Sequence, residues 1–183
     1  MIQLRARRAI GIAGVAIACV VLGAAGLATT RTQAVKARPS WKAHLASVDA
    51  ALAAKNVSAA VMAWRDAYGA ALATREWEAM LAVGQTSLRI DQVAGDRAEF
   101  EPKARQSYLA ALFRARQQGS LDGVLHATEA FATLGDRDVV EQGLRIARQV
   151  AGRDHVAQAR VRGFAERFVN GVLAADTSPN EPF

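Results

Sequence analysis

Histidines are the side chains best suited to metal binding or acid–base chemistry in this chain, and they are widely separated. His44, His126 and His155 lie in different parts of the sequence, and none has a second histidine four residues away. His126 and Glu129 are three residues apart, but such a pair binds a metal only where further ligands converge on it. We therefore expect a polar helix face at this position, and no metal site.

Sequence motifs of the common enzyme classes are missing. Neither Gly-x-Gly-x-x-Gly nor Gly-x-x-x-x-Gly-Lys-Ser/Thr occurs, so no glycine-rich turn is expected to bind phosphate. No serine has a Gly-x-Ser-x-Gly context. The single cysteine, Cys19, lies in an apolar stretch, where it is a small apolar residue. We expect no catalytic residue and no cofactor, and we do not expect an enzyme.

Arginines recur in the last third of the chain. Arg145, Arg148, Arg160 and Arg162 are our candidate partner-binding residues. Arginines of this kind usually form a solvated face whose aliphatic stems are buried, and nearby acids such as Glu141 favour that interpretation. They also bind acidic partners or anionic lipid head groups. Both interpretations stay open at this point.

An apolar, uncharged stretch near the N-terminus predicts contact with a membrane. It runs from Ala9 to Ala28 and follows Arg5, Arg7 and Arg8. At ~1.5 Å per residue it is just long enough to cross a ~30 Å hydrocarbon core. It is either a signal anchor that stays in the bilayer or a secretory signal peptide that is cleaved near Ala28. The length of the stretch favours the anchor.

The orientation and location of the chain follow from the same segment. Basic residues flank it on both sides, so their number does not decide the orientation. A very short charged N-terminus usually stays in the cytoplasm, and a composition rich in Ala, Arg, Gly and Val is typical of bacteria. We expect a single-pass protein of a bacterial inner membrane with a periplasmic C-terminal domain. Cleavage near Ala28 would instead give a periplasmic or secreted domain.

The charge pattern argues against binding to nucleic acid. The formal net charge is +6 for the whole chain, but beyond residue 28 there are 20 basic and 17 acidic side chains. Acids are interspersed among the bases from Asp49 to Glu166, whereas a nucleic-acid-binding protein gathers its basic residues on one face. No nucleic-acid partner is expected.

Helical spacing of apolar residues continues from Pro39 to about Leu173. Ser40, Asn56 and Thr74 are suited to cap the first three helices. The segment 93–101 is predicted to be the main break. No stretch alternates as a strand does, so the predicted fold class is all-α. The expected helices cover about 40–55, 57–72, 75–90, 103–118, 120–134, 138–151 and 154–173.

A shift of 63 residues aligns the first helices with the later ones without a gap. It pairs Pro39 with Pro102 and Tyr68 with Phe131, two aromatic residues that we expect at equivalent buried positions. Helices that merely share an amphipathic phase are the alternative explanation. The predicted domains are a signal anchor or signal peptide at 1–30, a linker at 31–38, a helical-repeat domain at 39–174 and a disordered tail at 175–183. The approximate units of the domain are 39–101 and 102–164, followed by a C-terminal helix.

Two stretches, 56–68 and 119–131, carry a family resemblance. Each opens with a small polar residue or glycine, and an alanine–aromatic pair follows about three turns later. In this they resemble the second helix of the tetratricopeptide repeat, although the usual 34-residue length and the Trp, Leu-Gly and Tyr pattern of its first helix are absent. The resemblance implies antiparallel helical hairpins stacked in an α-solenoid, preceded here by the N-terminal transmembrane or signal helix.

These observations predict an adaptor. A membrane-tethered helical-repeat domain would bind another protein of an envelope complex through a groove between its helices, and contact the membrane through residues 9–28. The alternative is an extracytoplasmic helical domain that binds a small apolar ligand or lipid. An enclosed apolar cavity would favour this carrier, and an open groove with polar and aromatic walls would favour the adaptor.

Overall fold

The computed structural model describes residues 40–95 and 97–176, and these residues are entirely helical apart from short connections. The all-α prediction is therefore confirmed for the described part of the chain, which contains no strand. The predicted anchor at 9–28 and the end of the predicted tail, from residue 177, lie outside it. Within the described ranges, no helix combines the length and the apolar character that crossing a bilayer requires. The helices are α1 (Trp41–Ala53), α2 (Val57–Ala73), α3 (Trp77–Ala94), α4 (Arg97–Gln117), α5 (Leu121–Thr133), α6 (Arg137–Ala151) and α7 (His155–Asp176).

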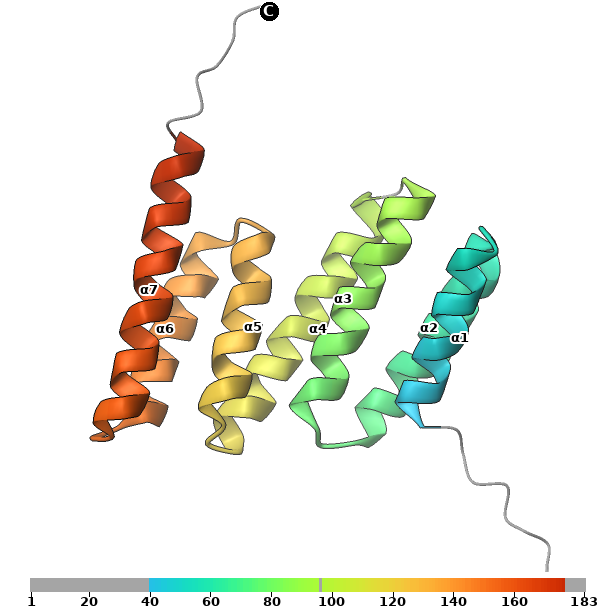
Figure 1. The fold of residues 1–183 in the computed structure, drawn as a ribbon. Helices are drawn as coiled ribbons and strands as arrows, with labels where there is room; N and C mark the ends of the chain where they lie inside the picture. The colour runs from blue at the N-terminus through green and yellow to red at the C-terminus, as the bar shows by residue number, and fades with distance from the viewer. Residues whose placement is uncertain (1–39, 96, 177–183) are drawn as a thin grey trace, which may run out of the picture. The chain divides into compact units, whose positions relative to one another are not determined.

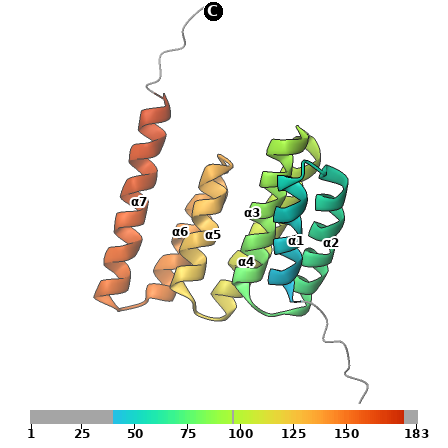
Figure 2. The ribbon, with the colours of Figure 1, turned by 45° about the vertical axis from the view of Figure 1, so that its right-hand side comes forward.

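Short connections fold these helices into successive antiparallel hairpins (Figure 1). Each helix packs on the next along the chain. In addition, α1 contacts α3, α3 contacts α5, and α5 contacts α7. The odd-numbered helices therefore form one layer and the even-numbered helices the other, as the turned view also shows (Figure 2). This arrangement is compatible with a helical-repeat solenoid.

Polar residues cap three helices: Ser40 and Asn56 do so as predicted, and Ser120 is an additional cap. The side chains of Ser40, Asn56 and Ser120 accept hydrogen bonds from backbone N–H groups in the first turns of α1, α2 and α5. The prediction for Thr74 is wrong. This residue ends α2, and its hydroxyl donates to the carbonyl of Ala71 at 3.0 Å. The N-cap position of α3 is Glu76, two residues later, and it makes no side-chain capping hydrogen bond. A threonine between two helices can hydrogen-bond to the end of the preceding helix or to the start of the following one, and Thr74 bonds to the preceding helix.

The main break is shorter than the predicted segment 93–101. α3 ends at Ala94, Gly95 adopts a left-handed conformation (φ 72°), and α4 already begins at Arg97. α4 then continues through Pro102, which lacks an N–H group and so forfeits one hydrogen bond near the helix start. Burial of Phe100 on the core accounts for the early start of the helix. The predicted unit boundary between 101 and 102 thus lies inside a continuous helix.

Aromatic residues form the centre of the core. The Trp64 indole on α2 is buried and donates to the carbonyl of Val83 on α3 at 3.0 Å. Tyr108 on α4 and Phe131 on α5 are each about 1% exposed and pack edge to face, with ring centroids 5.8 Å apart. Gly84 on α3 allows this packing, since a Cβ there would lie 2.5 Å from the Tyr108 ring. These contacts join α2, α3, α4 and α5.

The 63-residue alignment agrees with the order of the helices but not with the burial of the aromatic pair. Shifted by 63 residues, α1, α2 and α3 overlap α4, α5 and α6. Phe131 is buried as expected, whereas Tyr68 is half-buried and stacks on Trp64 at 5.4 Å. Trp64 fills the inner position on α2, while the matching residue on α5 is Ala127, which leaves that space to Phe131. Equivalence of the two units stays a prediction.

Candidate functional site

An open groove of about 270 Å³ lies between α5 and α7, in the layer of odd-numbered helices. Each of its walls uses one helical face, with residues at positions i, i+3, i+4 and i+7. The two walls match in pattern, since charged residues lie at both ends and less polar residues between them. We call this the α5–α7 groove. Its lining consists of Asp122, Leu125, His126 and Glu129 from α5, and Arg160, Gly163, Phe164 and Arg167 from α7.

One end of the α5–α7 groove is closed by an ion pair. Arg160 donates to the Asp122 carboxylate, which joins α7 to the first turn of α5. The hydrogen bond and charge of Arg160 hold the pKa of Asp122 below its usual value. Both side chains are about half exposed, so the pair contributes little to stability and acts mainly to fix the geometry.

His126 extends this end of the groove towards α3. Its Nδ1 lies 2.8 Å from the carbonyl oxygen of Asp122, and because a carbonyl can only accept, Nδ1 carries the hydrogen. The imidazole stacks on the indole of Trp77, with ring centroids 5.9 Å apart. Trp77, His126 and the Asp122–Arg160 pair thus form a continuous line of side chains across α3, α5 and α7.

The other end of the groove is open. The Arg167 guanidinium lies over the Phe164 ring, 5.6 Å from its centroid, and makes no ion pair with the described residues. Glu129 faces it from α5 as part of the same lining. Between the charged ends, Leu125 is half-buried and packs against the core, whereas Phe164 belongs to the core and is only 6% exposed. This half therefore combines a cation stacked on a buried ring with the small apolar surface of Leu125.

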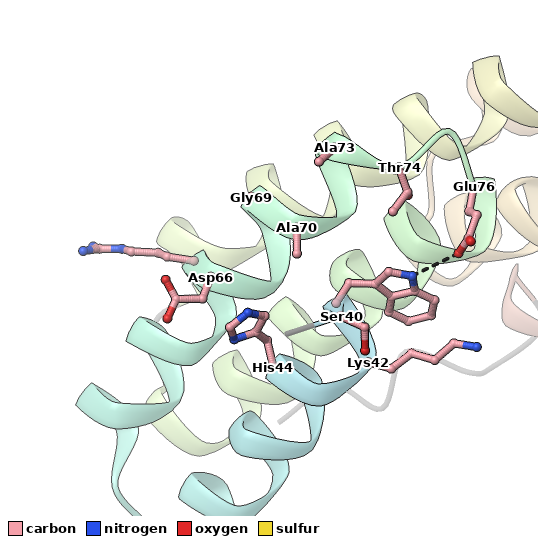
Figure 3. Close-up of a pocket in the computed structure, with 11 residues that line it drawn as sticks. Ser40, Lys42, His44, Asp66, Gly69, Ala70, Ala73, Thr74 and Glu76 are labelled. Atoms are coloured by element: carbon pink, nitrogen blue, oxygen red, sulfur yellow. Dashed lines mark hydrogen bonds between the residues drawn. The ribbon is translucent and has the colours of Figure 1, made fainter. Parts of the chain in front are cut away.

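A second open groove, of about 740 Å³, lies between α1 and α2 and ends at the start of α3 (Figure 3). The α2 side of the groove carries only small side chains in its second half, because Gly69, Ala70 and Ala73 line it. Trp41 closes one end by donating its indole N–H to Glu76 at 3.0 Å. Charges of both signs line this α1–α2 groove, including Lys42, His44, Arg65 and Asp66. Neither groove is an enclosed apolar cavity.

The histidines do not form a metal site. His44 lines one groove and His126 the other, while His155 begins α7. His126 and Glu129 do line the same wall, but in the described ranges no three potential ligands come together as a metal requires.

The four candidate arginines do not all lie on one face. Arg145 donates to Gln142 on its own helix at 2.6 Å, and Arg148 is exposed one turn further along α6. Arg160 pairs with Asp122 across the α5–α7 groove. Arg162 is exposed on α7 two residues later, which places it about 200° around the helix from Arg160. The structure therefore brings Arg160 into a groove and leaves Arg162 on another side of α7.

Sequence analysis missed the residues that complete the α5–α7 groove. Leu125, Gly163, Phe164 and Arg167 have the i, i+3, i+4 spacing of a helical face, but so do the core-facing residues of the same helices. A signal was present in the charge distribution: residues 137–168 contain seven arginines and four acids, whereas residues 97–136 contain five basic and five acidic residues. The positive excess of the described part therefore lies on α6 and α7.

Comparison with known proteins finds no matching family model, no matching curated protein and no matching solved structure.

Proposed function

We propose that this protein is a membrane-tethered adaptor with a tetratricopeptide-like helical-repeat domain. Residues 9–28 would anchor it in a bacterial inner membrane, and the helical domain would bind another envelope protein in the periplasm. The alternative location, a periplasmic or secreted form cleaved near Ala28, leaves the binding role unchanged.

The observation that carries this proposal is the character of the α5–α7 groove. It is open, it is lined by both charge signs, and at its open end Arg167 stacks on the largely buried ring of Phe164 beside the half-buried Leu125. Protein-binding surfaces combine apolar and aromatic anchors with a polar rim, and arginine is enriched in them. The α1–α2 groove is also open and charged, which supports a protein segment over a small apolar ligand as the occupant.

Copurification from membranes tests the adaptor function. The affinity-tagged full chain would be expressed at its native level, extracted in mild detergent, and analysed by quantitative mass spectrometry. A matched control would carry residues 1–38 fused to a fluorescent protein, so that it has the same membrane segment without the helical domain. We expect one envelope protein to be enriched near stoichiometry with the full chain only. Absence of any such enrichment, with and without a chemical cross-linker, would contradict the adaptor function.

A further inference from the structure

We propose that one end of the helical domain binds the surface of an anionic lipid bilayer. The cations of this end would contact lipid phosphates, and its exposed apolar side chains would insert between the head groups. The inference rests on the membrane anchoring in the proposed function. It adds a second membrane contact, which the adaptor role does not require.

The end in question is the one at which the chain enters the domain. Because the helices alternate in direction, α1 begins there, and the connections α2–α3, α4–α5 and α6–α7 lie at the same end (Figure 1). The connections α1–α2, α3–α4 and α5–α6 lie at the opposite end. We call the first the basic end. It consists of residues 40–44, 70–80, 114–124 and 148–158, and the opposite end consists of residues 50–60, 91–95, 97–101 and 130–140.

The two ends differ in charge. The basic end has six basic and four acidic side chains, whereas the opposite end has three basic and five acidic ones. The contrast depends on position along the helices, since residues 97–136 as a whole contain equal numbers of both signs. The six cations of the basic end are Lys42, Arg75, Arg114, Arg116, Arg148 and Arg153.

Ion pairs do not neutralise these cations. None of the six pairs with a carboxylate of the described residues, and Arg114 donates instead to three backbone carbonyls. One of the four acids, Asp122, is itself neutralised by Arg160, which lies just outside the basic end. Six cations therefore face three remaining carboxylates. The positive excess of this end is free to act on a partner.

The opposite end is neutral by comparison. Lys103 and Arg105 lie just beyond residue 101 and pair with three of its five acids. With these two cations included, five basic side chains balance five acidic ones. An anionic lipid surface attracts Lys and Arg side chains in excess of nearby acids, so it attracts the basic end more strongly than the opposite one. The paired acids are Glu99, Glu101 and Asp136.

Exposed apolar side chains gather at the basic end as well. Leu72, Phe113 and Val156 are 49%, 54% and 71% exposed, and each lies within four residues of a helix terminus there. In the described ranges, Val93 is the one large exposed apolar residue so placed at the opposite end. Arg114 follows Phe113 directly and donates to the carbonyl of Leu72 at 3.4 Å. Apolar side chains next to cations suit the boundary between lipid head groups and acyl chains, where both find partners.

The attachment of the chain also favours contact of this end with a bilayer. Residues 29–39 separate Ala28 from Ser40, and eleven residues extend no further than about 40 Å. The entry point is fixed to the domain, because Ser40 caps α1 and the Trp41 indole N–H donates to Glu76 at 3.0 Å. The 18 residues of α3 place the opposite end about 27 Å farther away. Anchoring through residues 9–28 therefore presents the basic end to the lipid.

Fluorescence energy transfer to the bilayer tests this inference with the full chain in nanodiscs. The lipid is phosphatidylcholine alone or an equal mixture with phosphatidylglycerol, and some head groups carry an acceptor. The donor is attached through Gln149→Cys at the basic end or Gln92→Cys at the opposite end, both exposed, with Cys19→Ala in each chain. We expect phosphatidylglycerol to raise the transfer from position 149 only. Salt at about 1 M, where the screening length is about 3 Å, should abolish the rise. Equal transfer from position 149 in both lipids, or an equal rise at both positions, would overturn the inference.

Charge variants make the test specific. Arg75→Gln combined with Arg116→Gln should lose the rise, because each Lys or Arg near an anionic surface strengthens binding about fivefold and two do so about thirtyfold. The matched control, Lys55→Gln with Arg65→Gln, removes the same charge outside the basic end and should keep the full rise. Phe113→Ala should reduce the rise, because its ring no longer inserts between head groups. All five side chains are exposed, so circular dichroism should show native helicity throughout. An undiminished rise in the first variant would refute the role of its cations.

These results are separable from those of the adaptor test. If the chain stays in both kinds of nanodisc but phosphatidylglycerol has no effect, the second contact fails while the anchoring and the adaptor function stand. If the chain leaves both kinds of nanodisc, the anchoring fails, and flotation with vesicles of the same two lipids then tests the basic end alone. We expect binding to the vesicles that contain phosphatidylglycerol only, and equal binding to both or to neither would overturn the inference.

Discussion

Truncation of Phe131 to alanine tests the packing of α5 on α4 most directly. The ring is about 1% exposed and packs edge to face on Tyr108, which is equally buried. Truncation of a fully packed phenylalanine to alanine lowers the free energy of unfolding by about 3 to 5 kcal/mol, because the transfer free energy of the ring is lost and a cavity is left behind. The aromatic pair accounts for about 0.5 to 1.5 kcal/mol of this. Because a whole domain is stable by only about 5 to 15 kcal/mol, the variant should be close to unfolding at physiological temperature.

The matched control for this change is Phe113→Ala on α4. Phe113 is 54% exposed, so its truncation should change the free energy of unfolding by no more than about 0.5 kcal/mol. Urea and thermal unfolding of the full chain in mild detergent, followed by circular dichroism at 222 nm, would measure both. At about 3 °C per kcal/mol, the melting temperature of Phe131→Ala should fall by about 10 to 15 °C. Equal losses for Phe131→Ala and Phe113→Ala would refute the register of α5 described above.

Three further predictions concern packing and titration. Gly84→Ala should destabilise the fold by about 1 to 3 kcal/mol in urea unfolding, because its Cβ would lie 2.5 Å from the buried Tyr108 ring, whereas Gly69→Ala, which meets no atom within 4 Å, should not. NMR titration should find the pKa of Asp122 below its usual value, and the pKa should rise towards that value in Arg160→Gln. The stability that the ionised Asp122 contributes is present above its usual pKa and is lost as the pH falls through its pKa in the folded state. An unchanged Asp122 pKa in that variant would contradict the ion pair. Burial raises the pKa of Tyr108 to about 12, so stability should be lost as pH rises from about 10, where the unfolded phenol ionises, towards 12. Tyr108→Phe should remove that alkaline loss, and a persistent loss of the same size would assign it to other groups.

Local chemistry explains which features of the fold could be predicted from sequence. Ser40, Asn56 and Ser120 cap helices by hydrogen bonds within three residues, so each signal is complete in a short stretch. Thr74 has a local signal for both neighbouring helices, and the sequence alone does not decide between them. The start of α4 depends on burial of Phe100, which only the packed structure determines.

The α5–α7 groove was harder to predict because its contacts join distant positions. Asp122 and Arg160 are 38 residues apart, and their pairing depends on which face of α7 meets α5. Helical spacing defines faces but does not say which face is the contact face. Arg160 and Arg162 illustrate this, since both are exposed arginines of one helix and only Arg160 lines the groove.

Site-specific photo-cross-linking in living cells tests the adaptor function most directly. A photoreactive phenylalanine analogue would replace Glu129 on the groove wall in the full chain, and, as the control, Met62, which is 67% exposed on α2 and lines neither groove. We expect one discrete cross-linked product in the membrane fraction from position 129 and none from position 62. Equal products from both positions, or no product from position 129, would contradict the conclusion that this helical domain docks a partner through the α5–α7 groove.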